Sequence, residues 1–553
     1  MTTLSQSTRM SISPILPSSS PNLFDPHWLR SRQVVERIVI VGTLVLDTPT
    51  HFGNGDAEGL TDMPLACDPL TGAPLLAGAS IAGALRHYLR EREMGYGRPE
   101  DRKRKQHDKS LAERLFGHID ESEVDLQQTR TNGGSAVQSW LFVDDAIGEV
   151  GSSAGYELRD GVAINRERRT ASDKQKYDIE LLAAGTRFPL RFELWLTQAD
   201  QDKGDLLQAL VTALLGLASG EIGMGQRKRR GFGECHVEDW LTHRYDMCQA
   251  SGLLGWLENA EDKANSELGL PTVASLIDQR REFHIAATFA IDGALLIRSD
   301  SGADNSIDMA HLQRGKDPIL PGTSLAGVLR AHIARIANAV LQPGNAQPDV
   351  GQRVTDVLFG RDMNTRHDDA HAIDANPLLP QNLKPQPTGS RILVRERIID
   401  SKLVSNKQVQ SRVKIDRLTG GSLPTALFNQ QPLWSPEQAR ATVCVDIRLR
   451  HYVDPIDTAE GAADRADKRY KAGIGLLLLA LKDLWLGDVT IGGESSVGRG
   501  RFIGQSACLI DHAAGSERRW EITGTHSLNI SGESANELEK YVAVIAQSAE
   551  VWA

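Results

Sequence analysis

Two glycine-rich stretches of the sequence combine residue types that can bind phosphate. The segments "PLLAGASIAGALR" (74–86) and "PILPGTSLAGVLR" (318–330) both read as a turn followed by a helix. Small residues there let backbone N–H groups approach a ligand, and the positive end of the helix dipole favours an anion. Alternatively, the glycines only permit tight packing of helix on sheet. The candidate phosphate-binding residues are Gly78, Ser80, Gly83, Arg86, Gly322, Ser324, Gly327 and Arg330.

Three basic clusters offer further phosphate contacts, although the whole chain is acidic. The formal net charge of −10 argues against a protein that coats nucleic acid by bulk electrostatics. Clusters at 101–109, 165–176 and 225–233 would confine phosphate binding to loops or grooves. A solvated loop is the alternative for each cluster, and it is favoured for 101–109, where acidic residues are interspersed.

The same landmarks recur in the same order in both halves of the chain. The pairs are Gly78 with Gly322, Arg86 with Arg330, "LFG" at 115–117 with "LFG" at 358–360, Ile164 with Ile415, Ile222 with Ile491, and Gly231 with Gly500. The separation between partners grows along the chain. This pattern predicts two copies of one domain, the second carrying extra loop residues.

Each copy is predicted to contain strands and helices in one order. β-Branched, roughly alternating residues indicate a first strand at 34–49 and at 283–298. After the glycine-rich helix come further strands and a second helix, at 187–198, 205–220, 441–453 and 472–487. This order predicts an α+β fold made of two tandem ferredoxin-like (RRM-like, split βαβ) modules with long insertions.

Composition limits the class of protein. The five cysteines are odd in number, widely spaced and never arranged as CxxC, which argues against a disulfide framework or a thiolate zinc site. No run reaches the roughly 18 apolar residues that a membrane span requires, so we expect a cytoplasmic protein with no membrane partner. The expected divisions are a flexible tail at 1–32, modules at 33–244 and 282–505, a connector at 245–281 and a C-terminal extension at 506–553.

These motifs resemble the RAMP superfamily, which forms the repeating backbone of type III CRISPR effector complexes. The resemblance rests on 62–86, 159–190 and 223–234 in the first copy and on 317–330, 414–428 and 492–502 in the second. Two backbone modules in one chain look most like the double-backbone subunits of type III-D-like effectors. The implied partners are crRNA as the guide, target RNA and other type III effector subunits.

The resemblance also implies an endoribonuclease. In such subunits an aspartate between the first strand and the glycine-rich helix promotes metal-dependent cleavage of target RNA, and Asp62 and Asp308 match that position. Both would be catalytic and metal-binding, with Mg²⁺ as the expected divalent metal. Asp292, Asp300 and Asp304 compete with Asp308. The segments 159–182 and 408–428 look like the thumb hairpins that flip a target nucleotide.

Guide binding is implied for further residues on loops. They are His51, Arg166, Arg227, Lys228, Arg229, Arg230, Arg417, Arg499 and Arg501, besides the glycine-rich helix residues. His51 lies where relatives often have a histidine near the guide, whereas the second copy has Leu296. A lone loop histidine can equally be incidental.

Two other functions stay open. The chain could be a structural guide-RNA scaffold whose cleavage is done by other subunits. It could also be a guide-processing enzyme, although such an enzyme has no evident need for two guide cradles. His367, Asp369, His371 and Asp374 have metal-friendly spacing, but their polar surroundings favour a solvated loop.

Overall fold

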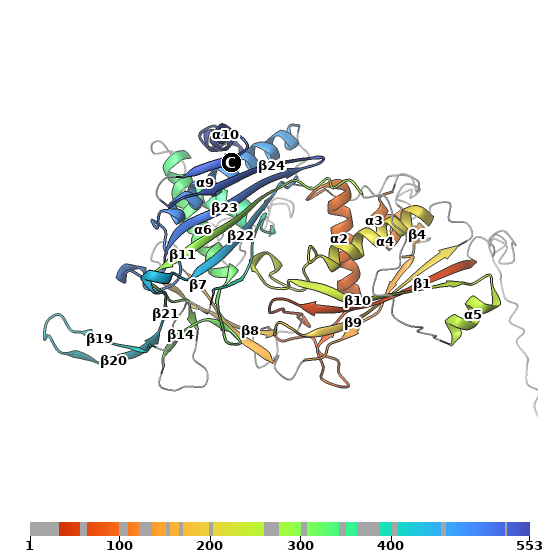
Figure 1. Cartoon of the computed structure of the whole chain (residues 1–553), viewed down its shortest axis with the longest axis horizontal. Coiled ribbons are helices and arrows are strands. Elements are labelled where there is room, and N and C mark those ends of the chain that lie inside the picture. The colour runs from red at the N-terminus through yellow and green to blue at the C-terminus, as the bar shows by residue number, and fades with distance from the viewer. Residues whose placement is uncertain are drawn as a thin grey trace, which may run out of the picture.

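Two α/β modules lie side by side in the computed structural model of the chain (Figure 1). The structure describes residues 33–55, 63–98, 109–120, 135–150, 155–164, 170–197, 203–258, 276–299, 307–341, 350–361, 388–400, 408–454, 460–525 and 528–552. In this part of the chain, no helix has the length and apolarity to cross a bilayer. The prediction of two mixed α/β modules is confirmed.

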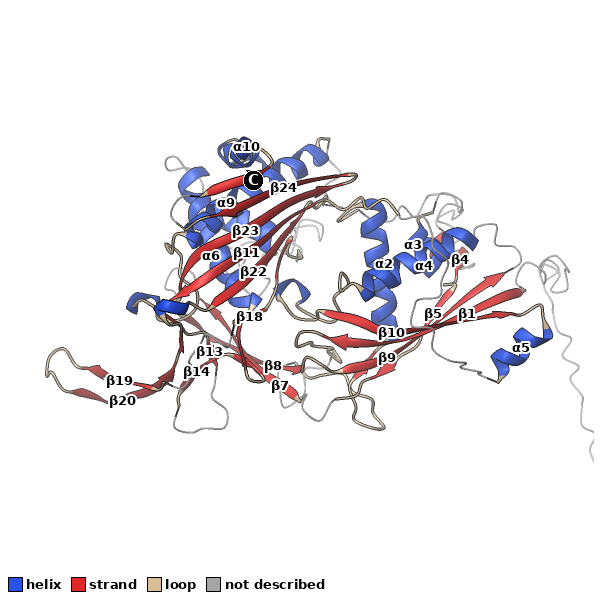
Figure 2. Cartoon of the chain, in the orientation of Figure 1, coloured by secondary structure: helices blue, strands red, loops and turns tan. Residues whose placement is uncertain are grey.

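The first module is built on a four-stranded antiparallel sheet in the order β10-β1-β9-β5. These strands are β1 (Val34–Leu46), β5 (Leu141–Val143), β9 (Arg187–Thr197) and β10 (Cys235–Asp246). Helices α2 (Gly78–Met94), α3 (Leu111–Phe116) and α4 (Lys203–Ala218) gather on one side of the sheet (Figure 2). Alternating apolar residues such as Ile38 and Ile40 are fully buried in the core, as the period-two pattern predicts.

The second module repeats this order with two added strands. Its sheet runs β17-β22-β11-β23-β24-β25. The strands are β11 (Glu282–Asp292), β17 (Ile392–Val394), β22 (Thr442–Arg450), β23 (Arg501–Ala513), β24 (Ser516–Thr523) and β25 (Asn529–Gly532). Its helices are α6 (Gly322–Leu341), α7 (Val350–Phe359), α9 (Ala462–Trp485) and α10 (Ala535–Ala546).

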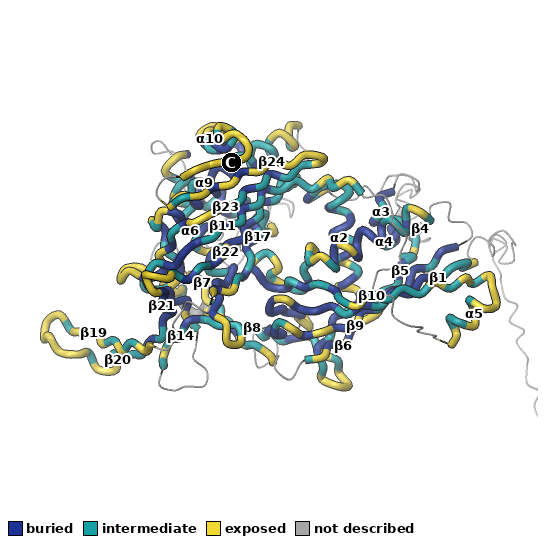
Figure 3. Tube along the Cα trace, viewed as in Figure 1, coloured by how far each residue is buried: buried dark blue, intermediate teal, exposed yellow. Residues whose placement is uncertain are grey.

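Two long hairpins extend from the modules. The first pairs β7 (Tyr156–Ile164) with β8 (Ala171–Leu182), and the second pairs β19 (Gln410–Ile415) with β20 (Ser422–Gln431). The β19–β20 hairpin projects away from the second module, and its tip is exposed (Figure 3). Hairpins therefore occur where 159–182 and 408–428 led us to expect them.

Short elements complete the two modules. They are β2 (Leu75–Leu76), β3 (His118–Asp120), β4 (Ser135–Val137), β6 (Ala146–Ile147), α5 (Ala250–Leu257), β12 (Ala294–Leu295), β13 (Arg298–Ser299), β14 (Met309–His311), β15 (Gln313–Arg314), β16 (Asp317–Leu320), β18 (Arg397–Ile398) and β21 (Leu433–Trp434). The single turns of 3₁₀ helix are η2 (Lys228–Arg230), η5 (Glu437–Ala439), η6 (Ser495–Val497) and η7 (Ala549–Trp552).

Each module buries its own apolar core. One cluster joins residues of the first sheet to α2 and α4, and a separate cluster joins the second sheet to α6, α7, α9 and α10. The C-terminal helix α10 packs on the second module, because Tyr541 donates to the buried carboxylate of Asp511 at 2.7 Å. The expected limits at residues 244 and 505 fall inside strands β10 and β23.

The sequence pattern overestimated the length of the first strand in each module. They end at Leu46 and Asp292 rather than near residues 49 and 298. In the second copy the chain turns at Gly293, whose φ of 81° lies in the left-handed region that glycine adopts readily. Polar turn residues therefore stop the strand although the apolar run continues.

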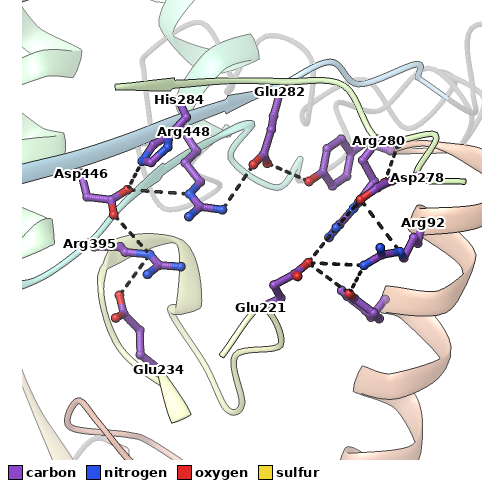
Figure 4. A network of polar contacts seen from close by, with 12 residues as sticks. Arg92, Glu221, Glu234, Asp278, Arg280, Glu282, His284, Arg395, Asp446 and Arg448 are labelled. Atoms are coloured by element: carbon purple, nitrogen blue, oxygen red, sulfur yellow. Dashed lines mark hydrogen bonds and ion pairs between the residues drawn. The ribbon is translucent and has the colours of Figure 1, made fainter. Parts of the chain in front are cut away.

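The two modules meet at a polar junction drawn in Figure 4. Arg280 binds Glu221 of the first module at 2.7 Å. Glu234 binds Arg395 and Arg397 of the second module, each at 3.4 Å. We call these contacts, with the hydrogen bond from Tyr96 to Glu282 at 2.9 Å, the module junction.

Asp446 anchors the second-module side of this junction. Its carboxylate accepts hydrogen bonds from Arg397 at 2.6 Å and from His284 at 3.1 Å. Burial alone would raise the pKa of Asp446, but the bond from His284 and the charges of Arg395 and Arg448 outweigh it and hold the pKa well below its usual range. The ionised carboxylate therefore stabilises the fold above the unfolded-state pKa of about 4, and this contribution is lost as the pH falls.

We predict that Asp446→Asn lowers the stability of the second module at pH 7 by about 1–3 kcal/mol, because partly buried guanidinium groups lose their counter-charge. The difference from wild type should narrow as the pH falls from 5 to 3, measured by urea denaturation. Glu521→Gln, which removes a carboxylate from the exposed pair with Arg519, is the matched control. A difference that is constant with pH would contradict the role given to Asp446.

Candidate nucleic-acid interface

The first glycine of each glycine-rich helix is a packing residue. A Cβ on Gly78 would lie 2.3 Å from the carbonyl oxygen of Val143, and one on Gly322 would lie 2.4 Å from that of Val394. The amide of Gly78 donates to Asp145 Oδ1 at 2.7 Å. A carboxylate thus already occupies one N–H group at the start of α2, and Gly78 and Gly322 serve the close approach of helix and sheet.

The second glycine of each helix has a different environment. Gly83 and Gly327 are exposed, and a Cβ at either position would meet no atom within 4 Å. A mid-helix glycine costs about 0.5–1 kcal/mol relative to alanine, chiefly through backbone entropy. Packing within this chain does not require that cost at either position.

These open glycines belong to a helix face of small residues that ends in an arginine. In α2 the face consists of Ala79, Ala82, Gly83 and Arg86, which line a groove of about 310 Å³. Spacings of three and four residues place side chains on one face of a helix. Apolar side chains of Phe116, Leu141 and Val143 form the opposite wall.

The second copy repeats the face but holds its arginine differently. Thr323, Ala326, Gly327 and Arg330 follow the same spacing in α6. Arg330 donates to Asp356 of α7 at 2.6 Å, so its guanidinium is directed within the module. Ser80 and Ser324 lie in the first turns, where their amides bond to Ala77 and Pro321 carbonyls at 2.9 and 3.1 Å.

The late glycine loops of the two copies correspond two residues away from the predicted pairing. A Cβ on Gly233 would lie 1.9 Å from Met224 O, and one on Gly500 lies at the same distance from Ile491 O. Met224 and Gly233 therefore match Ile491 and Gly500, and the predicted pairs of Ile222 with Ile491 and Gly231 with Gly500 are wrong. The apolar residues Ile222 and Met224 alternate in the loop, which made the two registers similar in sequence.

The corrected register separates the basic residues of the two loops. Lys228, Arg229 and Arg230 form η2 in the first copy, whereas Ser495, Ser496 and Val497 form η6 in the second. The basic triplet is therefore a property of the first copy alone. It lies at the module junction, since Arg230 O would be 2.5 Å from a Cβ on Gly322.

The four basic residues of this loop have different surroundings. Arg227 donates to the hydroxyl of Tyr177 in β8 at 2.6 Å and stacks on its ring, so it ties the loop to the first hairpin. Desolvation by the surrounding protein lowers the pKa of Lys228, and the positive charge of Arg450 adds to this. Arg230 is exposed.

Besides Gly78 and Gly322, the predicted RNA-binding residues His51 and Arg499 are buried. His51 is 1% exposed, and its Nδ1 lies 2.8 Å from Glu180 O. Arg499 is 3% exposed and binds Glu494 at 2.7 Å and Gln430 at 3.0 Å. Both side chains fix the base of a hairpin, and Leu296 is the structural counterpart of His51, since Gly225 packs on His51 O as Gly492 packs on Leu296 O.

Asp308 lies at the base of the second hairpin with an exposed carboxylate. Its Oδ2 accepts from the amide of Asn429 at 2.7 Å, and its own amide donates to Asn429 O at 3.1 Å. These two bonds fix the aspartate beside β20. Arg417 is exposed in the turn between β19 and β20, next to Leu418, which is 96% exposed.

The competing aspartate Asp292 is engaged by arginines. Arg440 binds its Oδ1 at 3.0 Å, and exposed Arg501 lies 3.9 Å from its Oδ2. Asp62, Arg166, Asp300 and Asp304 lie outside the described residues, as do His367, Asp369, His371 and Asp374. Across the described ranges, no three His, Cys, Asp or Glu side chains converge as a metal site.

Sequence reasoning missed the residues that neighbour these candidates. Asp145 at the start of α2, Tyr177 under Arg227 and Asn429 beside Asp308 all come from segments distant in the sequence. No local pattern marks them. Their positions follow from the pairing of β5, β8 and β20 in the folded sheets.

Two tandem modules of matching strand order define the chain as a repeated α/β protein. A family model described as the RAMP superfamily matches residues 43–236 and 289–503, more than half of the chain. The chain therefore belongs to the RAMP superfamily, which indicates a CRISPR-associated RNA-binding subunit. No curated protein was found to match the chain.

We predict that the two kinds of glycine respond oppositely to alanine. Gly83→Ala and Gly327→Ala should each stabilise the fold by about 0.5–1 kcal/mol, since they gain helix propensity and meet no neighbour. Gly78→Ala and Gly322→Ala should destabilise it by about 1–3 kcal/mol through overpacking. Thermal unfolding of the four variants measures this, and equal effects at all four positions would refute the division.

Proposed function

We propose that the chain is a crRNA-binding backbone subunit of a type III CRISPR effector complex that cleaves target RNA complementary to the guide. Two modules of one family in a single chain fit the double-backbone subunits of type III-D-like effectors. In each module, strands in the order β10-β1-β9-β5 or β23-β11-β22-β17, with α2 and α4 or α6 and α9 as the two connecting helices, support a ferredoxin-like core.

The observation that carries guide binding is the open glycine within each small-residue helix face. Gly83 and Gly327 occupy matching positions and cost helix stability, and a Cβ at either position would meet no atom of the chain within 4 Å. A face of small residues suits a sugar-phosphate strand, because backbone can approach closely without reading bases. In the first module Arg86 lines the same groove, where a guanidinium can bind phosphate. Two such faces would hold two segments of one periodic strand.

Cleavage is proposed at Asp308, with Asp62 as its counterpart. A ribose 2′-hydroxyl attacks the adjacent phosphorus as its O–H bond breaks, and the bond from phosphorus to the 5′-oxygen breaks as that oxygen gains a proton. The products are a 2′,3′-cyclic phosphate and a 5′-hydroxyl. An exposed carboxylate fixed by Asn429 can accept the first proton or orient the hydroxyl.

A divalent cation fits this position as a singly anchored, hydrated ion. The Oδ2 of Asp308 accepts the Asn429 amide, which leaves Oδ1 on the exposed side for a ligand. Mg²⁺ usually keeps several waters and takes one or two carboxylates together with substrate phosphates. When bound, the ion would supply neutralisation of charge on the phosphate oxygens.

We predict that bulk at the open glycines weakens guide binding. Gly83→Leu and Gly327→Leu should each reduce the affinity for single-stranded RNA by about tenfold, because a side chain separates the strand from the helix, while thermal stability is kept. Filter binding with the purified chain measures the effect. Leu215→Ala, at an exposed position of α4, is a control for helix-surface change. Unchanged affinity in both leucine variants would overturn this binding mode.

Cleavage and scaffold functions are separated by a second prediction. In the assembled complex with Mg²⁺ and complementary RNA, Asp62→Ala and Asp308→Ala should each abolish one discrete cut and leave target binding intact. Glu521→Ala, on β24 and away from both hairpins, removes an exposed carboxylate as the control. If all cuts persist in both variants, the chain is the non-catalytic scaffold, and its partners do the cleavage.

A further inference from the structure

Three arginines converge at the module junction without carboxylate partners. Arg391 precedes β17 and Arg450 ends β22, while Arg229 comes from η2 of the first module. Among the described residues, no carboxylate lies within ion-pair distance of any of the three. Most other arginines of the junction, such as Arg280 and Arg397, do have one.

Arg391 and Arg450 are direct cross-strand neighbours. Ile392 pairs with Leu449 in the antiparallel register of β17 and β22, and the amide of Arg450 donates to Arg391 O at 3.0 Å. Like charges directly opposite each other destabilise a sheet. The fold thus places two positive charges on neighbouring strands, and after burial the largest like-charge influence on Arg391 is that of Arg469, followed by that of Arg229.

Arg229 brings a third charge from the other module. Its Nη1 would lie 3.4 Å from a Cβ on Gly389, two residues before Arg391. Burial lowers the pKa of Arg229 to about 10, and the charge of Arg450 adds to this. Burial similarly lowers the pKa of Arg391 to about 10. Glu91, the nearest acidic influence on Arg229, is paired with His87 at 2.9 Å.

Aromatic rings hold two of the guanidinium groups in place. Arg450 lies 4.7 Å from the ring centre of Tyr96, a first-module residue, and Arg391 lies 5.3 Å from that of Tyr452. Stacking on a ring orients a guanidinium group, and the N–H donors at its edge, in the guanidinium plane, can still bind an anion. The cluster is therefore positioned by aromatic rings. The charges of Glu91, which acts on Arg229 and Arg450, and of Asp454, which acts on Arg391, oppose it without forming an ion pair with these arginines.

The junction is open beside this cluster. A cavity of about 400 Å³ is lined by Tyr96 and Arg98 of the first module and by His451 and Val453 of the second, together with Lys109 and Arg281. Burial, followed by the charge of Arg281, lowers the pKa of His451 to about 4, so its ring is neutral at pH 7. Glu93 also lines the cavity, and the charges of Lys109 and Arg281 are paired with Glu113 and Asp467. The cavity adjoins the cluster through Tyr96, on whose ring Arg450 lies.

We propose that Arg229, Arg391 and Arg450 form a binding site for a phosphate group shared by the two modules. A dianionic oxyanion accepts several charge-assisted hydrogen bonds and offsets the repulsion between the guanidinium groups. The phosphate can belong to an RNA strand or to a free ion. The site stands without the proposed guide function, because a free phosphate ion would occupy it equally.

The test uses the full chain and thermal unfolding at constant ionic strength. Arg391→Gln should raise the melting temperature in phosphate-free buffer by about 2–4 °C, since repulsion is relieved. Inorganic phosphate should raise the melting temperature of the wild-type chain. The affinity of Arg391→Gln for phosphate should be about tenfold to a hundredfold lower than that of wild type. Arg229→Gln should lower the affinity for phosphate in the same way, and it changes a loop residue rather than a residue of the sheet.

Arg519→Gln, which removes an exposed, paired arginine from β24, controls for charge and for general salt effects. A parallel titration with short single-stranded RNA distinguishes the sources. If only RNA stabilises the wild-type chain, and Arg391→Gln reduces that stabilisation, the bound phosphate belongs to RNA. If inorganic phosphate suffices, the ligand is the free ion. If neither ligand distinguishes wild type from Arg391→Gln and Arg229→Gln, no such site exists, whatever the outcome for guide binding.

Discussion

The close contact of Gly231 with the second module determines how the two halves of this protein sit together. Gly231 has a φ of 94°, and a Cβ there would lie 2.4 Å from the amide nitrogen of Glu396. The loop that carries Gly231 thereby reaches Gly322 at the start of α6. Backbone packs on backbone at this point, so the junction tolerates little displacement, and the ion pairs around Glu234 and Arg395 align on it.

The contact joins parts of the modules that have different roles. Arg159 of the first hairpin binds Glu396 at 2.6 Å, so the hairpin of one module is attached to the segment between β17 and β18 of the next. This contact therefore fixes the positions of the glycine faces, the hairpins and the basic triplet relative to one another. A strand of RNA bound along both faces would meet them at a fixed spacing.

Much of the fold could be predicted from the sequence because duplication shows the same pattern twice. The helix starts at Gly78 and Gly322 were expected from residue types, and the two hairpins were expected from the family resemblance. The pairing of the late loops was displaced by two residues, since Ile222 and Met224 offer equivalent apolar landmarks. The dual use of glycine, packed at position 78 and open at position 83, depends on what lies opposite each residue, which local sequence does not encode.

The two apolar cores are separate, and charged groups dominate what lies between them. Two separate proteins would associate only weakly through such a charged surface, because firm association requires a large hydrophobic interface. Fusion into one polypeptide removes that requirement, because a tether gives each module an effective local concentration on the order of millimolar at its neighbour. The contact surface therefore does not have to provide the affinity between the modules, and its residues can be selected for their charge instead.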